Sequence, residues 1–295
     1  MQRKLFDGVR RLLGAGQRSA AMRPRVIWTG ASSFGECPVW WAERNAICWL
    51  DIPSGTLRSY SIATSEVTTW NIGEMSAGLA RQEGDALLIG RGGALWQFDT
   101  HSARLTPYAT LPDHHADERT NDLAWDASGN LWVTTMHTGG EQTLGRLLRL
   151  TRDKRWMTVL TGVPILNGPA FDRAGRVGYV CDTVHRRILR FTPPANDATT
   201  CPRPETFITL TEAEGYPDGI TVDATGHLWL AHYAGARVSC HASDGTVQHV
   251  ISMPVRNVTS VAIGDDALYV TSARDPSDTS KALGGSLFSI PLNHD

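Results

Sequence analysis

The sequence predicts an all-β fold, a six-bladed β-propeller with four-stranded blades around a central channel. The first observation is a turn of pattern D-x-x-G followed by aromatic and β-branched residues, as in "DASGNLWVTT" (126–135) and "DATGHLWLAH" (223–232). Such a turn is typical of a hairpin whose second strand follows at once. Further copies, some of them looser, lie at 42–51, 82–91, 172–182 and 264–273.

The second observation is the spacing of the runs that precede these turns. Six short runs align, each with a polar residue four positions before its closing apolar residue, at 36–40, 76–80, 121–125, 167–171, 218–222 and 259–263. Successive runs begin 40, 45, 46, 51 and 41 residues apart, as propeller blades do. The segments lack the 3.6-residue apolar period of helical repeats, so each run is expected to be the innermost strand of a blade.

The two ends of the chain are expected to close the ring. The segment "VIWTG" (26–30) precedes the first blade, and "SLFSI" (286–290) belongs to the last. Pairing them within the last blade would remove the exposed sheet edges. We therefore expect one propeller domain over 23–295, preceded by a basic extension, flexible or a short helix, over 1–22.

The composition argues against several classes of function. The chain has 295 residues and a net charge of −2, so no overall positive field favours nucleic acid or an acidic membrane. No stretch approaches the roughly 20 apolar residues of a membrane span. Five scattered cysteines without a Cys-x-x-Cys pair favour a reducing cytoplasm over a disulfide framework or a thiolate zinc site. No G-x-S-x-G, Walker or dinucleotide motif supports serine-hydrolase, phosphate-loop or nicotinamide chemistry.

The polar residues that open the six runs are predicted to form a ring at one mouth of the channel. They are Glu36, Ser76, Asn121, Asn167, Asp218 and Thr259. Carboxylate, amide and hydroxyl oxygens are ligands that Ca²⁺, Mg²⁺ and Mn²⁺ prefer. A cation also offsets the repulsion between carboxylates in a narrow channel. The competing interpretation is that each residue caps its own turn, since Asn-Gly and Asp-Gly are ordinary turn pairs.

Few other polar residues are candidates for this mouth. Arg119, two positions before Asn121, should project near the ring and could hold a substrate oxygen. The loop residues His114 and His115 are expected to be solvated, and His232 to be structural. His137 stands where a loop over the substrate could begin, and the sequence leaves open whether it, His232 or Glu141 contacts substrate.

Several blocks of the sequence resemble the signature blocks of one known family. They are "GECPVW", "RTND", "TTM", "LNGPAF", "YPDGITVDATGHLWLAHYAG" and "LYVTSA", in the family's order, over about residues 30–292. On these blocks the chain resembles the SMP-30/gluconolactonase/luciferin-regenerating-enzyme family, sugar lactonase type. The resemblance implies a six-bladed propeller with one catalytic divalent cation.

The resemblance also assigns roles to particular residues. It implies that Glu36, Asn167 and Asp218 are metal ligands and that Arg119 and Asn121 contact substrate. Asp218 would also be the catalytic base. Ca²⁺ is the first choice of cation, with Zn²⁺, Mn²⁺, Mg²⁺ or Fe²⁺ as alternatives.

The activity predicted on this basis is the hydrolysis of a sugar lactone, an aldonolactone such as glucono-lactone, to the aldonic acid. The protein would act in carbohydrate metabolism as a monomer or weak homodimer. Two alternatives stay open: a phosphotriesterase-like hydrolase on the same metal site, and a calcium-binding or interaction propeller without turnover. Cys37 and Leu123 stand where the family usually has Gly, and both are expected to reshape the mouth.

Overall fold

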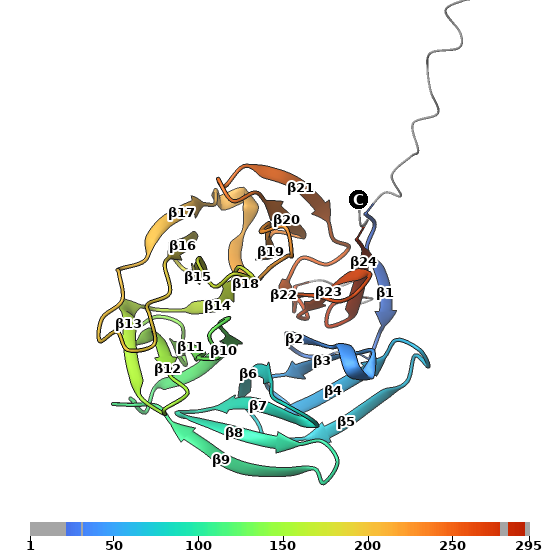
Figure 1. Ribbon diagram of the computed structural model, residues 1–295. Coiled ribbons are helices and arrows are strands. Elements are labelled where there is room, and N and C mark those ends of the chain that lie inside the picture. The colour runs from blue at the N-terminus through green and yellow to red at the C-terminus, as the bar shows by residue number, and fades with distance from the viewer. Residues whose placement is uncertain (1–21, 31, 278–282, 293–295) are drawn as a thin grey trace, which may run out of the picture.

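The computed structural model describes residues 22–30, 32–277 and 283–292, so the predicted extension over 1–22 lies almost entirely outside the described residues. In that part of the chain, 24 strands form six four-stranded antiparallel sheets. The sheets stand as blades around a central axis, with the first strand of each blade innermost (Figure 1). The predicted six-bladed propeller is therefore confirmed.

The strands of each blade run outward from the axis in chain order. Blade 1 consists of β2 (Gly35–Trp41), β3 (Ala46–Asp51), β4 (Thr56–Ser61) and β5 (Val67–Asn71). Blade 2 consists of β6 (Ser76–Arg81), β7 (Ala86–Arg91), β8 (Ala94–Asp99) and β9 (Arg104–Thr110). Blade 3 consists of β10 (Glu118–Trp125), β11 (Leu131–His137), β12 (Gly145–Leu150) and β13 (Trp156–Val163). Blade 4 consists of β14 (Leu166–Phe171), β15 (Gly178–Asp182), β16 (Arg187–Phe191) and β17 (Glu205–Thr209). Blade 5 consists of β18 (Tyr216–Val222), β19 (Leu228–Tyr233), β20 (Arg237–His241) and β21 (Val247–Ser252).

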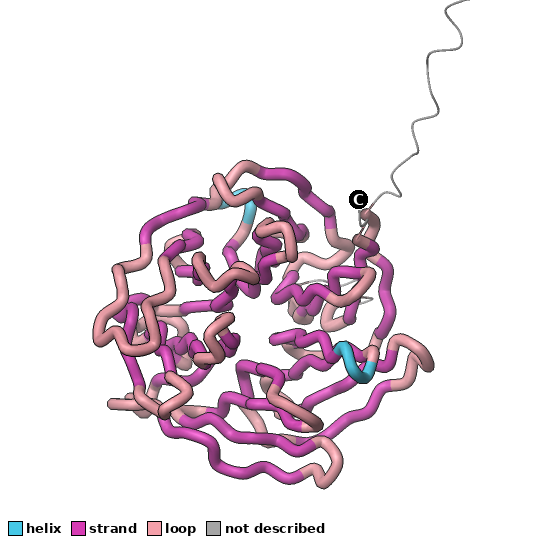
Figure 2. The backbone as a smooth tube through the Cα atoms, in the orientation of Figure 1, coloured by secondary structure: helices cyan, strands magenta, loops and turns pink. Residues whose placement is uncertain are grey.

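Blade 6 joins the two ends of the chain. It contains β22 (Val258–Ile263), β23 (Ala267–Ser272), β24 (Leu287–Pro291) and, outermost, β1 (Arg25–Trp28). Strand β1 pairs antiparallel with β24, as the sequence predicts for these segments. Two short 3-10 helices, Ala42–Arg44 and Glu212–Glu214, are the helical elements among the described residues (Figure 2).

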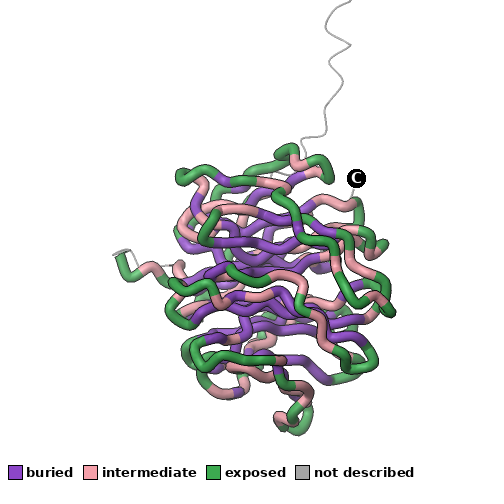
Figure 3. The backbone as a smooth tube through the Cα atoms, turned by 90° about the vertical axis from the view of Figure 1, so that its left-hand side faces the viewer, coloured by how far each residue is buried: buried purple, intermediate pink, exposed green. Residues whose placement is uncertain are grey.

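The hydrophobic core lies between neighbouring blades. One cluster packs Cys48 and Leu57 of blade 1 against Leu87 and Phe98 of blade 2. Equivalent clusters join the other blades, so buried residues fill the middle of each sheet and exposed residues mark the outer loops (Figure 3). Burial of apolar surface on both faces of the sheets holds the ring together.

Each innermost strand carries a β-bulge at its polar ring position. The register with the second strand shifts between Glu36/Val39, Ser76/Leu79, Thr120/Leu123, Asn167/Pro169, Pro217/Ile220 and Val258/Ser260. A bulge inserts an extra residue into the strand and re-aims its side chains. The repeat seen in the sequence is thus a repeat of bulges around the axis.

The bulges of blades 1 and 4 require left-handed backbone. Gly168 has φ +38°, which costs a glycine little. Cys37, which follows Glu36 as Gly168 follows Asn167, has φ +52°. A non-glycine residue in this conformation costs about 1 kcal/mol. Glycine would be the easier choice at position 37.

Candidate metal and substrate site

A cavity of about 450 Å³ opens at one end of the channel. Its walls include the five residues predicted to form the site, namely Glu36, Arg119, Asn121, Asn167 and Asp218. They come from the innermost strands of blades 1, 3, 4 and 5. The alignment of bulges thus brings together residues up to 182 positions apart, Glu36 and Asp218, in one cavity.

The remaining two members of the predicted ring do not line this cavity. The Ser76 hydroxyl donates a hydrogen bond to the Gly73 carbonyl at 2.7 Å. The Thr259 hydroxyl lies 2.6 Å from the Gly35 carbonyl. Both hydroxyls satisfy backbone carbonyls, so the ring of six is wrong for blades 2 and 6, and four of its members remain.

A chain of hydrogen bonds orients the two amides. Arg119 Nη1 donates to Asn121 Oδ1 at 3.0 Å, and Asn121 Nδ2 donates to Asn167 Oδ1 at 2.6 Å. Asn167 Nδ2 donates to Thr183 Oγ1 at 2.9 Å, and Thr183 donates to the Pro217 carbonyl. The chain links blades 3, 4 and 5, so neither amide caps its own turn.

The carboxylates of the site have raised pKa values. Burial, followed by the negative charge of Asp122, raises the pKa of Glu36 to about 8. Burial, followed by the charges of Glu36 and Asp122, raises the pKa of Asp218 well above its usual range. Arg119 is the one cationic side chain among the residues that line the cavity, and burial lowers its pKa.

This environment fits a divalent cation. The carboxylates of Glu36 and Asp218, with the amide oxygen of Asn167, form a donor set of hard oxygens. Burial and mutual repulsion disfavour the charged forms of these carboxylates, and a positive ion in their midst would offset both effects. Arg119 Nε is buried without a hydrogen-bond partner among the described residues, which leaves a donor for a ligand.

Asp122, which sequence reasoning missed, is a buried carboxylate beside the site, and its charge raises the pKa values of Glu36 and Asp218. Its Oδ2 accepts the Gly168 amide at 2.7 Å, and its Oδ1 accepts the Cys37 thiol at 3.1 Å. It therefore ties together the residues that follow Asn167 and Glu36. Asp122 directly follows Asn121 in "TND", which was the one available signal. The alignment of the repeats selected Asn121 and not the residue after it.

The two departures from the family pattern lie outside the cavity that holds the predicted ligands. Cys37 and Leu123 line a second cavity of about 410 Å³, built by the later parts of the innermost strands. Leu123 also fills the space beside Gly78, where an added Cβ would lie 2.8 Å from its side chain. Neither residue lines the first cavity, although the Cys37 amide donates to Glu36 Oε2 at 2.7 Å, so their expected effect on the substrate mouth stays a prediction.

The other walls of the first cavity are mostly apolar. They consist of Phe34, Ile52, Met136, Ile165, Thr183, Val184, Tyr216 and Tyr233. Phe34 stacks on Tyr233, with ring centroids 6.0 Å apart. Many of these residues lie at strand ends or in the loops beside them, which the alignment of the innermost strands does not select.

The histidines lie outside this wall. His114 and His115 are exposed, as expected. His232 is buried between the Glu214 carbonyl and the Ser239 hydroxyl, which agrees with the structural interpretation. The Nδ1 atom of His137 accepts the amide of Glu141, so His137 orders the loop that follows it.

The fold and cavity define a class of protein, a six-bladed propeller with carboxylates, amides and an arginine gathered in one cavity by its innermost strands. The chain belongs to the SMP-30/gluconolactonase/LRE-like family, whose model matches residues 34–274. It is similar to the pentonolactonase XacC of Haloferax volcanii, with 34% identity over 88% of each chain. It is 30% identical to an L-arabinolactonase of Azospirillum brasilense, over 82% of each chain.

A solved structure shows the same architecture. Regucalcin of Agrobacterium tumefaciens, described as a calcium-binding protein, superposes with a TM-score of 0.85 and 28% identity. The match covers 91% of this chain and 93% of the other.

None of the helices in the described part of the chain has the length and hydropathy that a membrane span requires.

Proposed function

We propose that this protein hydrolyses a sugar lactone to its hydroxy acid with the help of one divalent cation. The observation that carries the proposal is the cavity in which Glu36, Asn167 and Asp218 meet beside Arg119 and Asn121. The lactonase names of the two relatives favour the same chemistry. The calcium-binding neighbour favours Ca²⁺, with Zn²⁺, Mn²⁺, Mg²⁺ or Fe²⁺ as alternatives.

The residues would divide the work as follows. Glu36, Asn167 and Asp218 would hold the cation, which would polarise the lactone carbonyl as a Lewis acid. Arg119, with its unpartnered Nε, and Asn121 would orient oxygen atoms of the substrate. As water adds to the carbonyl carbon, Asp218 would accept a proton from it. The same proton would then go to the ring oxygen as the C–O bond breaks.

The neutral charge of Asn167 has a function in this proposal. An amide oxygen can bind the cation without adding a negative charge to a site that already holds Glu36, Asp122 and Asp218. Asn167→Asp should keep the cation but weaken its pull on the carbonyl. Asn167→Ala should lose both metal affinity and activity.

The test is acid release from glucono-, galactono-, xylono- and arabinono-lactones, before and after chelation and with each metal restored. A phosphotriester measured in parallel distinguishes the alternative hydrolase, and calcium binding without any turnover would favour the binding propeller. Activity that survives both chelation and Asp218→Ala would refute the proposal.

The compartment and the domain boundaries are part of the same proposal. All five cysteines are free in the structure, in keeping with a reducing cytoplasm. The closed ring supports a single catalytic domain over 23–295.

A further inference from the structure

Thr183 connects the two blades that carry Asn167 and Asp218. It directly follows strand β15, is buried, and lies in the wall of the first cavity. Its backbone amide donates to the Ile165 carbonyl at 3.2 Å, and its own carbonyl accepts the Arg186 amide at 3.0 Å. The backbone thus holds the Thr183 side chain in a fixed position beside the proposed ligands.

The hydroxyl of Thr183 has one hydrogen to donate, and the Pro217 carbonyl accepts it at 2.9 Å. A carbonyl oxygen cannot donate, so the direction of this bond cannot reverse. The hydroxyl oxygen is therefore left as an acceptor, and Asn167 turns its Nδ2 toward it at 2.9 Å. Thr183 thus determines which atom of the Asn167 amide faces it.

The opposite side of Asn167 favours the same orientation independently. Asn121 Nδ2 donates to the Leu166 carbonyl at 2.9 Å and to Asn167 Oδ1 at 2.6 Å. Arg119, which carries donors but no acceptor, donates to Asn121 Oδ1 at 3.0 Å. The Asn167 amide therefore has its nitrogen at Thr183 and its oxygen at Asn121, and this oxygen keeps a second lone pair for a ligand.

The orientation of this amide decides whether Asn167 can bind a cation. Its oxygen is a hard ligand, whereas its nitrogen carries two hydrogens and would repel a positive ion. The terminal torsion of an asparagine side chain is broad and roughly two-fold, so an unsupported amide would present either atom. The Pro217 carbonyl belongs to the peptide bond that leads into Asp218, so the same hydroxyl also holds the backbone of a second proposed ligand.

We infer that Thr183 is a positioning residue of the metal site, which makes Asn167 present its oxygen to the cation and ties it to the strand of Asp218. The inference rests on the proposed function for the presence of a cation, and it assumes nothing about the substrate. It goes beyond that function by assigning a role to a residue that acts through a ligand.

The test measures the affinity of the full chain for Ca²⁺, Mn²⁺ and Zn²⁺ by competition with a chromogenic chelator, without substrate. Thr183→Val keeps the β-branched shape and removes the hydroxyl. It should weaken binding of the tightest cation roughly 10- to 100-fold, the usual cost of losing a partner that orients a metal ligand. Thr183→Ser keeps the hydroxyl and should bind within about threefold of wild type. An equal loss with Thr183→Ser would overturn the assignment to the hydroxyl.

A second background separates orientation of the ligand from support of the fold. In Asn167→Asp the two carboxylate oxygens are equivalent, so no orientation remains for Thr183 to fix. Adding Thr183→Val to this background should change the affinity by less than about threefold, although the Pro217 carbonyl loses its donor in both backgrounds. Equal losses in the two backgrounds would overturn the inference. Thr183→Ala replaces Thr183→Val in both backgrounds if the latter does not fold.

Thr151→Val is the matched control. Thr151 is also buried, and its hydroxyl accepts the Arg155 amide at 3.1 Å and donates to the Arg155 carbonyl at 3.3 Å. It directly follows β12 and does not line the first cavity. Urea unfolding measures the loss of stability in both variants, and Thr183→Val alone should lose metal affinity. Equal affinities in the two variants would overturn the inference.

Metal binding without substrate also separates the inference from the lactonase proposal. The expected affinities together with no turnover of any lactone would overturn the catalytic proposal and leave the inference standing. Equal losses in the two backgrounds, with lactones still hydrolysed, would do the reverse. Absence of binding of every cation would overturn both.

Discussion

Two aspartates at opposite ends of strand β18 have contrasting environments. Asp218, near the start, is buried near Glu36 and Asp122, and its pKa is raised by burial and by their charges. Asp223 directly follows the strand and accepts hydrogen bonds from the Thr225 hydroxyl at 2.6 Å and the Trp229 indole at 3.0 Å. Burial alone would raise the pKa of Asp223, but these bonds outweigh it and the pKa is lowered.

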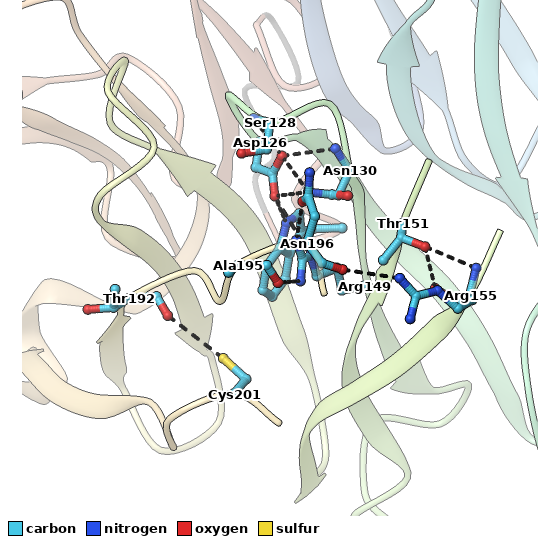
Figure 4. A network of polar contacts seen from close by, with 11 residues as sticks. Asp126, Ser128, Asn130, Arg149, Thr151, Arg155, Thr192, Ala195, Asn196 and Cys201 are labelled. Carbon is cyan, nitrogen blue, oxygen red and sulfur yellow. Dashed lines mark hydrogen bonds and ion pairs between the residues drawn. The ribbon is translucent and has the colours of Figure 1, made fainter. Parts of the chain in front are cut away.

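Blade 3 repeats the turn with a larger network (Figure 4). Asp126 accepts the Asn130 amide at 2.9 Å and the Trp132 indole at 2.8 Å. The fully buried Arg149 lies 3.9 Å from Asp126 and donates to Asn196 Oδ1 of the loop that follows β16. Turn carboxylates are thus satisfied by the protein itself, whereas we propose that the axial carboxylates of Glu36 and Asp218 bind a cation. On this proposal the same repeat stabilises the fold at one end of a strand and provides chemistry at the other.

The largest effect should come from the axial end. Asp218→Asn should lower kcat/KM for lactones at least about 1,000-fold, because it removes a proposed ligand and base. In the presence of chelator the same variant should be more stable than the wild type by about 1 kcal/mol, since one buried like charge is gone. Lactone kinetics and urea unfolding with and without chelator measure both effects.

The sign of the stability change is the decisive part of this experiment. If Asp218→Asn destabilises the metal-free protein, the carboxylate is compensated within the fold, and its contrast with Asp223 disappears. Adding Ca²⁺ should stabilise the wild type far more than the variant, because a ligand that binds only the folded state raises its stability.

Substitution of the turn aspartate of blade 3, Asp126, should have the opposite effect: a loss of stability with little change in kcat. Asp126→Ala leaves the Trp132 indole and the Asn130 amide without their acceptor and Arg149 without its nearby carboxylate. We expect a loss of about 3 kcal/mol in the free energy of unfolding, with kcat of the folded fraction within about twofold of wild type.

Chemical unfolding and active-site titration test this second prediction together. Ser128→Ala is a matched control in the same turn, because only its backbone amide contacts Asp126. A large fall in kcat at unchanged stability would show that the turn, too, acts in catalysis.

A third effect concerns His232, a buried group satisfied in its neutral form. Burial lowers its pKa to about 4; the neighbouring charges of Arg237 and His241 act in the same direction, and the hydrogen bond and charge of Glu214 oppose them. The unfolded chain binds the proton near pH 6.5, so stability should be full above that pH and fall as the pH drops from 6.5 to 4. A shift of this size corresponds to about 3 kcal/mol.

The measurement compares urea unfolding of the wild type and His232→Gln across this pH range. The variant removes the titrating group, so its stability should fall less steeply than that of the wild type. Parallel curves would mean that His232 binds its proton equally well in both states.

The sequence was sufficient for the fold and for selecting four of the five proposed site residues because both follow from one repeat; the fifth, Arg119, was selected by its place two positions before Asn121. The turn pattern and the 40–51-residue spacing define the blades, and residues at equal phase meet on the axis. The position of a residue within the repeat does not determine whether its hydroxyl reaches the cavity or binds a nearby carbonyl. That choice separates Ser76 and Thr259 from Asn121 and Asn167.

The residues that the sequence did not reveal depend on contacts between blades. Asp122 is bound to Cys37 and Gly168 across three blades, and the Phe34–Tyr233 stack joins blades 1 and 5. Such contacts involve positions 46 to 199 residues apart, so no local pattern encodes them.

The smallest effect is expected where a residue shares the phase of the site but not its cavity. Ser76→Ala removes one hydrogen bond to the Gly73 carbonyl, and should cost about 1 kcal/mol of stability while kcat/KM stays within about twofold. Asn121→Ala, at the equivalent position of blade 3, breaks the contact that links Arg119 to Asn167 and should lower kcat/KM about 100-fold or more. Lactone kinetics of the two variants at one metal concentration provide the comparison. Equal losses would mean that the ring position of blade 2 also serves the reaction, and the division between blades 2 and 3 would be wrong.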